Sequence, residues 1–196
     1  MSSATPFVHL HCHTEYSLLD GCNKIPELVS RAKELGQPAI AMTDHGVMCG
    51  AIQFYKECKK QGVKPLIGCE LYIAQRGMED KEANKDNRPY HFTLLAQDRV
   101  GYKNLLAMVS DAHMRGFYYK PRVDREMLAS HSQGIVALSG CLRGEVNDAL
   151  LSDDFNLAKK RLGELHDIYK DNFYVELMDH GIPEQKKTNV ELIKLA

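Results

Sequence analysis

The feature that most limits the fold is a regular alternation between short apolar runs and segments with helical spacing of apolar residues. Strands are expected at 7–12, 38–43, 66–74, 91–96, 135–138 and 173–178, and helices at 25–35, 47–61, 101–112, 145–151, 155–169 and 184–196. Repeated strand–helix units of this kind are typical of parallel strands joined by helical crossovers. We therefore expect an α/β fold in one domain over 1–196, a length that suits a single hydrophobic core.

Two architectures fit this alternation, a doubly wound open sheet and a (β/α) barrel. The nucleotide-binding open sheets carry a GxGxxG or GxxxxGK[ST] motif, and the chain has no GxGxxG after its first expected strand and no GxxxxGK[ST] anywhere. Their absence favours the barrel. The polar segment 75–88 and the aromatic, basic segment 115–122 are expected to be loops.

Side chains that bind metals lie near the ends of nearly all the expected strands. They are His11, His13, Asp20, His45, Glu70, His91 and Cys141. In a barrel the carboxyl ends of the strands surround one mouth, so residues far apart in sequence are expected to meet there. His91 stands at the start of its expected strand instead, a misfit that an error of a few residues in the strand boundary would remove.

The chemistry of these side chains favours transition metals. Imidazole, thiolate and carboxylate together suit zinc or manganese better than magnesium or calcium. Seven candidates exceed the three or four ligands of one catalytic zinc, which indicates two or three ions with Glu70 as a bridge. Closely spaced metals cleave phosphate esters by activating bound water, so no protein nucleophile is required, and the chain has no GxSxG motif.

Each of these residues also has a structural interpretation. An HxH pair arises by chance, His45 could cap a helix, Glu70 could pair with a lysine, and Cys141 could be a small buried hydrophobe. Placement at successive strand ends favours the joint, functional interpretation.

Other residues are expected around the site rather than in it. His9, Asp44 and His180 are candidates for a supporting shell, with a core position as the alternative for His9. In the 117–122 loop, Lys120 and Arg122 are candidates for contacts with DNA phosphates, beside aromatic rings that could stack a base. The alternative for this loop is a lid that packs its aromatic rings on the barrel.

Net charge and cysteine content limit the partners and the cellular compartment to be expected for this chain. The formal net charge of −1 gives no overall basic field, so any contact with nucleic acid has to be local. The six cysteines form no CxxC pair and follow no signal peptide, which is typical of reduced thiols in the cytoplasm. No apolar run has the length of a membrane span.

Several segments resemble a known family. HLHCHTEYSLLDG, TDHG, GCE, HFTLLA and SGCLRGEV are similar to the polymerase and histidinol phosphatase (PHP) domain. Longer segments, among them GFYYKPRVDREMLASHSQGIVALSGC and FYVELMDHGIPEQ, resemble more narrowly the PHP domains at the start of bacterial DNA polymerase III α subunits. The resemblance implies a distorted, TIM-like (β/α)₇ barrel with up to three zinc or manganese ions.

The resemblance also implies roles for the candidate ligands. His11 and His13 would bind a first metal, Glu70 would bridge to a second completed by His91 and Cys141, and Asp20 with His45 would hold a third. The implied activity is metal-dependent 3′–5′ exonuclease proofreading on a DNA 3′ end. The implied partners are the rest of the polymerase subunit and other replisome subunits. A non-catalytic docking module and a phosphoesterase like histidinol phosphatase are the alternatives.

One part of the family pattern has no counterpart in this sequence. The family supplies two more ligands from an Asp-x-His on a later strand, and the chain ends at Leu195–Ala196 without such a motif downstream. We therefore expect a fragment of a larger protein, a barrel truncated before its last strand, weak or absent activity in this piece, and polymerase domains outside it.

Overall fold

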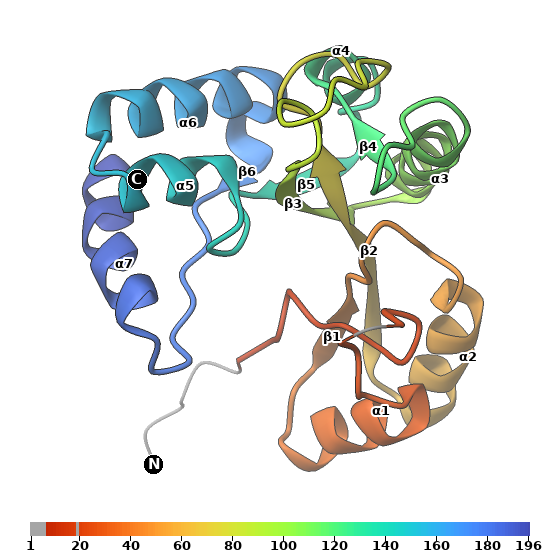
Figure 1. Cartoon of the computed structure of the whole chain (residues 1–196). Coiled ribbons are helices and arrows are strands. Elements are labelled where there is room, and N and C mark those ends of the chain that lie inside the picture. The colour runs from red at the N-terminus through yellow and green to blue at the C-terminus, as the bar shows by residue number, and fades with distance from the viewer. Residues whose placement is uncertain (1–6, 19) are drawn as a thin grey trace.

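The computed structural model describes residues 7–18 and 20–196 as a mixed α/β protein (Figure 1). The helices of this part are α1 (Ile25–Glu34), α2 (Ala51–Gln61), α3 (Arg99–Met114), α4 (Arg125–Ser130), α5 (Glu145–Leu151), α6 (Phe155–Tyr169) and α7 (Pro183–Leu195). The strands are β1 (Ala39–Met42), β2 (Lys64–Ile73), β3 (Tyr90–Ala96), β4 (Arg122–Val123), β5 (Ile135–Leu138) and β6 (Phe173–Tyr174).

The described strands form an open, mixed sheet in the order β1-β2-β3-β5-β6, with β4 paired to β2 off this path. Neighbours are parallel at β1–β2, β2–β4 and β5–β6, but β3 is antiparallel to both β2 and β5. The expectation of parallel strands throughout was therefore wrong at β3. A parallel connection needs a crossover, usually a helix, and residues 74–89 between β2 and β3 contain no helix, so the chain turns back on itself.

The reversal of β3 explains the position of His91. An antiparallel strand begins at the edge where its parallel neighbours end, and the register pairs His91 with Tyr72 near the end of β2. His91 thus reaches the common edge from the start of its strand, without any error in the strand boundary.

The N-terminal segment was expected to be a strand over 7–12, and this was wrong. Residues 7–13 have no regular secondary structure and join β1 through single hydrogen bonds. The amides of Ala41 and Thr43 donate to the carbonyls of His9 (3.0 Å) and Cys12 (2.8 Å). The segment therefore lies along β1 without forming a continuous ladder. Two elements, β4 and α4, were not expected, and β6 is shorter than the predicted strand at 173–178.

Helix ends follow local sequence signals. Asp98, Asp124 and Asp154 cap α3, α4 and α6, because each carboxylate accepts hydrogen bonds from backbone amides of the first turn. The start of α3 also lies against the chain that enters β5, since a Cβ on Gly101 would come within 1.7 Å of the Gly134 carbonyl oxygen. Only glycine fits at position 101.

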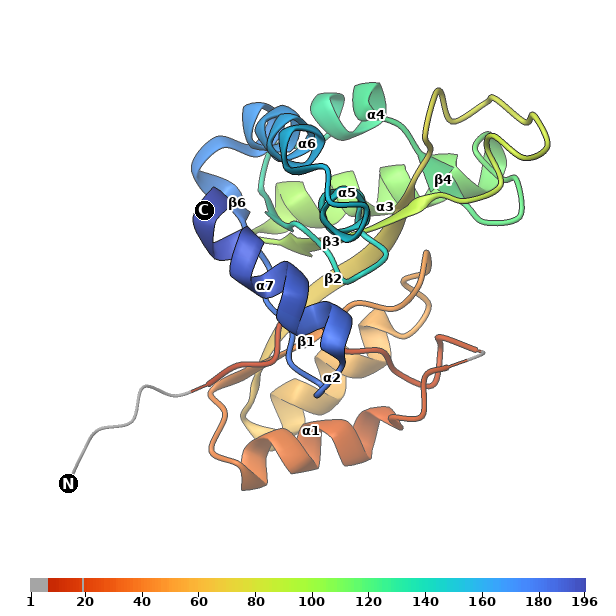
Figure 2. The same ribbon diagram turned by 60° about the vertical axis from the view of Figure 1, so that its left-hand side comes forward.

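Five of the helices form two groups on the sheet, and α3 packs against β2, β3 and β4. α1 and α2 pack together beside β1 and β2, and α5 packs against α6 and α7 (Figure 1). In the second view α1 and α2 lie at the bottom, α5 and α6 lie at the top, and α7 runs in front of β1 (Figure 2). The core between helices and sheet contains large apolar side chains with almost no exposure, such as Phe54, Phe92, Ile25, Met42, Leu71, Leu94 and Leu105.

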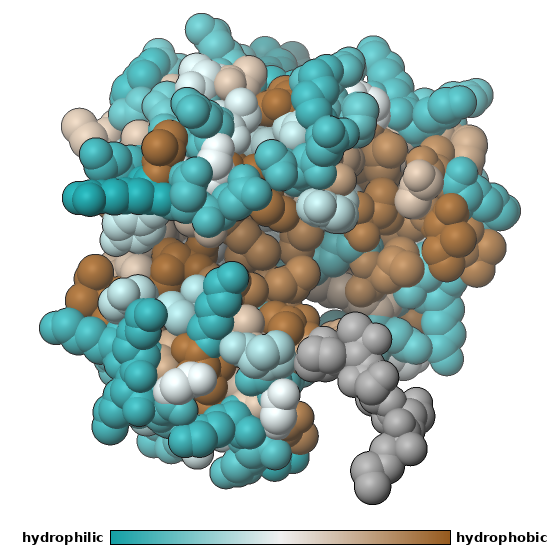
Figure 3. All heavy atoms as spheres, turned by 180° about the vertical axis from the view of Figure 1, so that it is seen from behind, coloured by the Kyte–Doolittle hydropathy of each residue, from teal (hydrophilic) through white to brown (hydrophobic). Residues whose placement is uncertain are grey.

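A smaller apolar cluster of Ala41, Leu95 and Leu138 lies apart from this core. Leu95 and Leu138 also line a groove of about 770 Å³ between the N-terminal segment and the chain after β6. Seen from behind, apolar side chains gather in a hollow across the middle of the molecule (Figure 3). An open sheet is compatible with a distorted barrel, and closure into a seven-stranded barrel stays a prediction. In the described part of the chain, no helix combines the length and apolarity needed to cross a bilayer.

Candidate metal centre

Four histidines and one glutamate meet at the edge where β1 and β2 end and β3 begins. Their donor atoms form two groups, His11 with His13 and Glu70, and His45 with Glu70 and His91, and within each group these atoms lie within 4.8 Å of one another. Glu70 belongs to both groups. The structure thus places a carboxylate in the bridging position between two possible ion sites.

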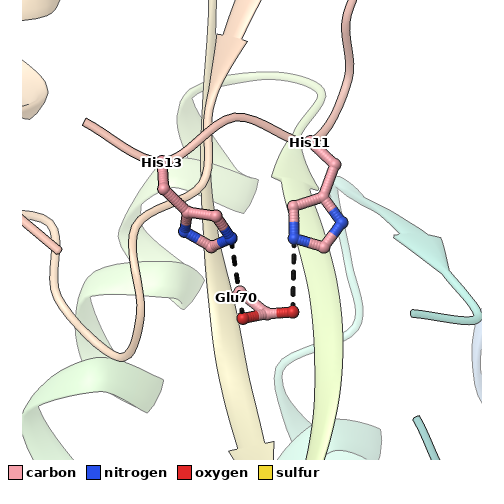
Figure 4. A group of neighbouring side chains, drawn as sticks. All are labelled: His11, His13 and Glu70. Atoms are coloured by element: carbon pink, nitrogen blue, oxygen red, sulfur yellow. Dashed lines mark ion pairs between the residues drawn. The ribbon is translucent and has the colours of Figure 1, made fainter. Parts of the chain in front are cut away.

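Glu70 is the centre of this cluster. It lies on β2, its side chain is 1% exposed, and both of its oxygens face imidazole nitrogens. His11 Nε2 lies 3.2 Å from Oε1, and His13 Nε2 lies 3.9 Å from Oε2 (Figure 4). His91 Nδ1 lies 3.0 Å from Oε2, and His45 Nδ1 also contacts that oxygen.

Backbone pairing sets His45 beside Glu70. The Glu70 amide donates to the Asp44 carbonyl (3.1 Å) and the Gly46 amide donates to the Glu70 carbonyl (2.9 Å), which extends the β1–β2 pairing past the end of β1. The Asp44 side chain, expected in a supporting shell, is fully buried and accepts hydrogen bonds from Thr14 and Ser17. It therefore anchors the turn that follows His13, rather than contacting the donor atoms.

The two remaining predicted ligands also reach the cluster. Asp20 is exposed, and its Oδ2 lies 2.9 Å from His45 Nε2. The Cys141 sulfur lies 3.6 Å from Glu70 Oε1 and 3.7 Å from His91 Nδ1, on the turn that follows β5. All seven candidate ligands therefore converge, although they come from five separate parts of the chain.

Two of the predicted supporting residues lie elsewhere. His9 is exposed and its ring contacts Phe7, so the core alternative for His9 was wrong. His180 is exposed, and its Nδ1 lies 3.0 Å from Gln185 Nε2. Both line the apolar groove and make no contact with Glu70 among the described residues.

The two predicted phosphate contacts differ from each other. Arg122 is fully buried, and its guanidinium donates to backbone carbonyls on both neighbouring loops, so the prediction that it binds DNA was wrong. Lys120 is exposed, and its Nζ lies 5.4 Å from the centre of the Tyr72 ring. That ring lies 6.0 Å from His45 and 5.1 Å from His91, which places Lys120 at the rim of the cluster.

Glu176 also belongs to the cluster and was not among the predicted residues. Its Oε1 lies 2.7 Å from His11 Nδ1, and its side chain is 9% exposed. The sequence signal was present, because a carboxylate follows the aromatic pair of β6. The strand was expected to run on to 178, so the residues predicted at its end were Asp179 and His180 rather than Glu176.

The cluster perturbs its own pKa values strongly. Burial would raise the pKa of Glu70, but the surrounding His11, His45 and His91 rings outweigh burial and lower the pKa far below its usual range. Burial would lower the pKa of His11, but hydrogen bonds to Glu176 and Glu70 raise it to about 10. For His13 burial prevails and lowers the pKa to about 4. The metal-free cluster therefore holds protons on some imidazoles and not on others.

The cluster fits divalent cations. His45 Nδ1 and Glu70 Oε2 are buried and, although they face each other, neither has a hydrogen-bond partner of acceptable geometry among the described residues. Buried polar atoms are nearly always paired, so such a pair of orphaned acceptors is what a cation would satisfy. Burial raises the pKa of the Cys141 thiol to about 12, and a nearby cation favours the thiolate that binds zinc.

Comparison with known proteins identifies the family of this chain. The family described as the PHP domain matches residues 9–180. DNA polymerase III subunit alpha of Thermus aquaticus is 48% identical over 200 residues, covering 100% of this chain and 16% of that protein. The same subunit of Treponema pallidum (strain Nichols) is 45% identical over 192 residues, covering 97% of this chain and 16% of that protein. The chain thus spans 16% of the length of these curated relatives.

A solved structure supports the fold. A protein of Bifidobacterium adolescentis, assigned as a metal-dependent phosphoesterase, superposes with a TM-score of 0.59 at 16% sequence identity. The match covers 96% of this chain and 82% of the other. The family match over residues 9–180 shows that this chain belongs to the PHP domain family.

Proposed function

We propose that this chain is the PHP domain of a bacterial DNA polymerase III α subunit and that it hydrolyses phosphodiesters at DNA 3′ ends with divalent metal ions. Similarity to two such subunits over nearly the whole chain supports the parent protein. In that setting the domain works in the cytoplasm, its activity serves proofreading, and a later strand closes the barrel. The hydrolytic part depends on one observation, the convergence of six other ligand-type side chains with Glu70.

The first ligand set is one of the two observed groups that share Glu70, and the other two sets follow the family pattern, which divides His45 and His91 between two ions. His11, His13 and Glu70 would hold one ion, Glu70, His91 and Cys141 a second, and Asp20 with His45 a third. Zinc and manganese both suit this mixture of nitrogen, oxygen and sulfur. When bound, such ions activate water and stabilise charge on phosphoryl oxygens.

The chain's own residues prepare the site for a phosphate ester. Glu70 keeps the imidazole rings close together. His13 has its pKa lowered to about 4, so it is neutral at physiological pH and can bind a metal ion without losing a proton. Lys120 at the rim offers a mobile positive charge beside the cluster, where a backbone phosphate next to the 3′ end would lie.

The test is hydrolysis of a 3′-labelled single-stranded oligonucleotide after chelation and return of Mn²⁺ or Zn²⁺. It is run on this chain and on the whole polymerase subunit proposed to contain it. His91→Ala is expected to abolish the metal-dependent activity, while the matched variant His166→Ala, at an exposed histidine of α6, leaves it unchanged. Elemental analysis gives the metal content per chain.

Each alternative predicts a different outcome. A folded protein without bound metal would support a docking module instead. Faster release of phosphate from histidinol phosphate than from DNA would support a small-molecule phosphoesterase. Hydrolysis that survives His91→Ala would contradict the proposed site.

A further inference from the structure

Glu176 is a buried carboxylate whose second oxygen is unused. Oε1 lies 2.7 Å from His11 Nδ1, and the buried Oε2 has no hydrogen-bond partner among the described residues. The side chain contacts none of the other candidate ligands by hydrogen bond or ion pair in that part of the chain. Burial of a carboxylate costs desolvation unless hydrogen bonds compensate it, and in the described part of the chain the Glu176 carboxylate is hydrogen-bonded to His11.

The two nitrogens of His11 face different carboxylates. Nε2 points to Glu70 Oε1 at 3.2 Å, at the centre of the cluster, while Nδ1 points to Glu176 away from it. Thr93 Oγ1 is a second neighbour of Nδ1 at 3.2 Å. Because Nδ1 carries one hydrogen, the shorter contact to the charged acceptor takes it. A neutral His11 with its hydrogen on Nδ1 has the lone pair of Nε2 directed at the cluster.

Glu176 is itself held in place. It lies beyond β6 in a segment without regular secondary structure, and its backbone amide donates to Ser139 Oγ at 2.9 Å. The Ser139 amide in turn donates to the Tyr174 carbonyl at 2.9 Å. Ser139 directly follows β5, on the same turn as Cys141. The carboxylate is therefore anchored to a strand end that also supplies a candidate ligand.

We infer that Glu176 is a positioning residue for the metal centre: by accepting the Nδ1 hydrogen of His11 it fixes the tautomer and ring orientation that make Nε2 the ligand atom. This inference rests on the proposed metal-dependent function. Metal-bound histidines commonly donate their other ring hydrogen to a carboxylate, and loss of such a partner typically weakens metal affinity about 10–100-fold.

The experiment measures Zn²⁺ binding to the full chain by calorimetry for the wild type, Glu176→Ala and Glu176→Gln. We expect Glu176→Ala to weaken the site that contains His11 by about 10–100-fold. Glu176→Gln should lose less, because an amide oxygen still accepts the hydrogen. The control is Glu145→Gln, which also removes a buried carboxylate but at an ion pair with Arg125, and it should leave Zn²⁺ affinity unchanged.

A second measurement separates positioning from a general loss of stability. In the Zn²⁺-loaded wild type, proton NMR should show a strongly hydrogen-bonded Nδ1–H of His11, shifted upfield in Glu176→Gln and lost to exchange in Glu176→Ala. If Glu176→Ala does not fold, Glu176→Gln decides alone, and unchanged affinity with an unchanged resonance overturns the inference. Wild-type affinity in a folded Glu176→Ala overturns it as well. A wild type that binds no Zn²⁺ overturns the proposed function together with this inference.

Discussion

Two parts of this molecule bury a charged side chain, and they do so in opposite ways. Arg122 is 0% exposed, and its guanidinium hydrogens go to four backbone carbonyls at 2.7–3.0 Å, those of Gly116, Asp86, Met78 and Asp80. Glu70 is 1% exposed, and it is surrounded by imidazoles but has one oxygen without a hydrogen bond. A buried charge that is fully satisfied is complete as structure, whereas an unsatisfied one indicates a missing ligand.

The difference between Arg122 and Glu70 also separates a residue that stabilises the fold from a residue that serves the proposed function. The Arg122 fork ties the 78–86 loop to the 116–122 loop, both of which lack helices. The Glu70 cluster joins residues that the fold has already brought together. We therefore expect changes at Glu70 to affect metal binding and hydrolysis first, and changes at Arg122 to affect stability first.

The largest effect is expected from Glu70→Ala. The variant removes the carboxylate shared by both ligand groups, and the metal contribution of several kcal/mol corresponds to a loss of about a thousandfold or more in hydrolysis. Metal content by elemental analysis should fall in parallel, with folding verified by circular dichroism. A folded variant that keeps the metal and the activity of the wild type would show that Glu70 is as structural as Arg122.

The next effect is expected from Arg122→Met. Arg122→Met leaves four carbonyls without their donors, and each buried acceptor left unsatisfied costs about 1–3 kcal/mol, so we expect a loss of about 3 kcal/mol or more. Denaturant unfolding measures this loss in free energy, and metal content per folded chain should stay at the wild-type value. A loss below about 1 kcal/mol would mean that water replaces the guanidinium and that the two clusters differ less than their geometry indicates.

The sequence predicted the Glu70 cluster far better than the Arg122 cluster, for a physical reason. Ligand-type residues at successive strand ends must meet if the strands share an edge, so convergence follows from topology. The antiparallel turn of β3 did not disturb it, because reversal brought His91 to the same edge. Nothing local in the 115–122 segment indicates burial of Arg122, because three of its four acceptors belong to a second loop far away in sequence.

The same reasoning explains the other differences from expectation. Glu176 was missed because its role depends on where β6 ends, and a strand boundary is the least certain result of pattern analysis. The 7–13 segment alternates like a strand but pairs with β1 only through scattered hydrogen bonds, which no local pattern distinguishes from a ladder. The helix α6, which Asp154 caps, was predicted to the residue, but α3 was predicted two residues short at each end and α4 was not predicted, although aspartates cap both of them.

A smaller effect, on metal affinity, is expected from pH and should appear only at the Glu70 cluster. His11 has its pKa raised to about 10 and so holds a proton at neutral pH in the metal-free protein. A metal ion must displace that proton, so affinity rises with pH between about 7 and 10, by up to about tenfold per unit for each proton released. His13, with its pKa lowered to about 4, adds nothing in this range.

Calorimetry in two buffers of different ionisation enthalpy measures the protons released on Zn²⁺ binding. The Arg122 cluster carries no group that titrates here, so Arg122→Met should leave the slope unchanged. An affinity that does not depend on pH would mean that neither His11 nor the Cys141 thiol loses a proton to the metal, which would remove a ligand from each of the two proposed sets that contain Glu70.

The smallest effect is expected at Lys120, two residues from Arg122 but exposed. Lys120→Ala should change the free energy of unfolding by less than about 0.5 kcal/mol, because the side chain makes only a surface contact with Tyr72. An exposed charge pair with a phosphate is worth about 0.2–1 kcal/mol, so the KM for the oligonucleotide should rise by up to about fivefold at low salt and by less at high salt. The matched control is Lys159→Ala, at an exposed lysine of α6 away from the cluster. Equal effects of the two variants would mean that DNA responds to total charge rather than to the rim of the metal centre.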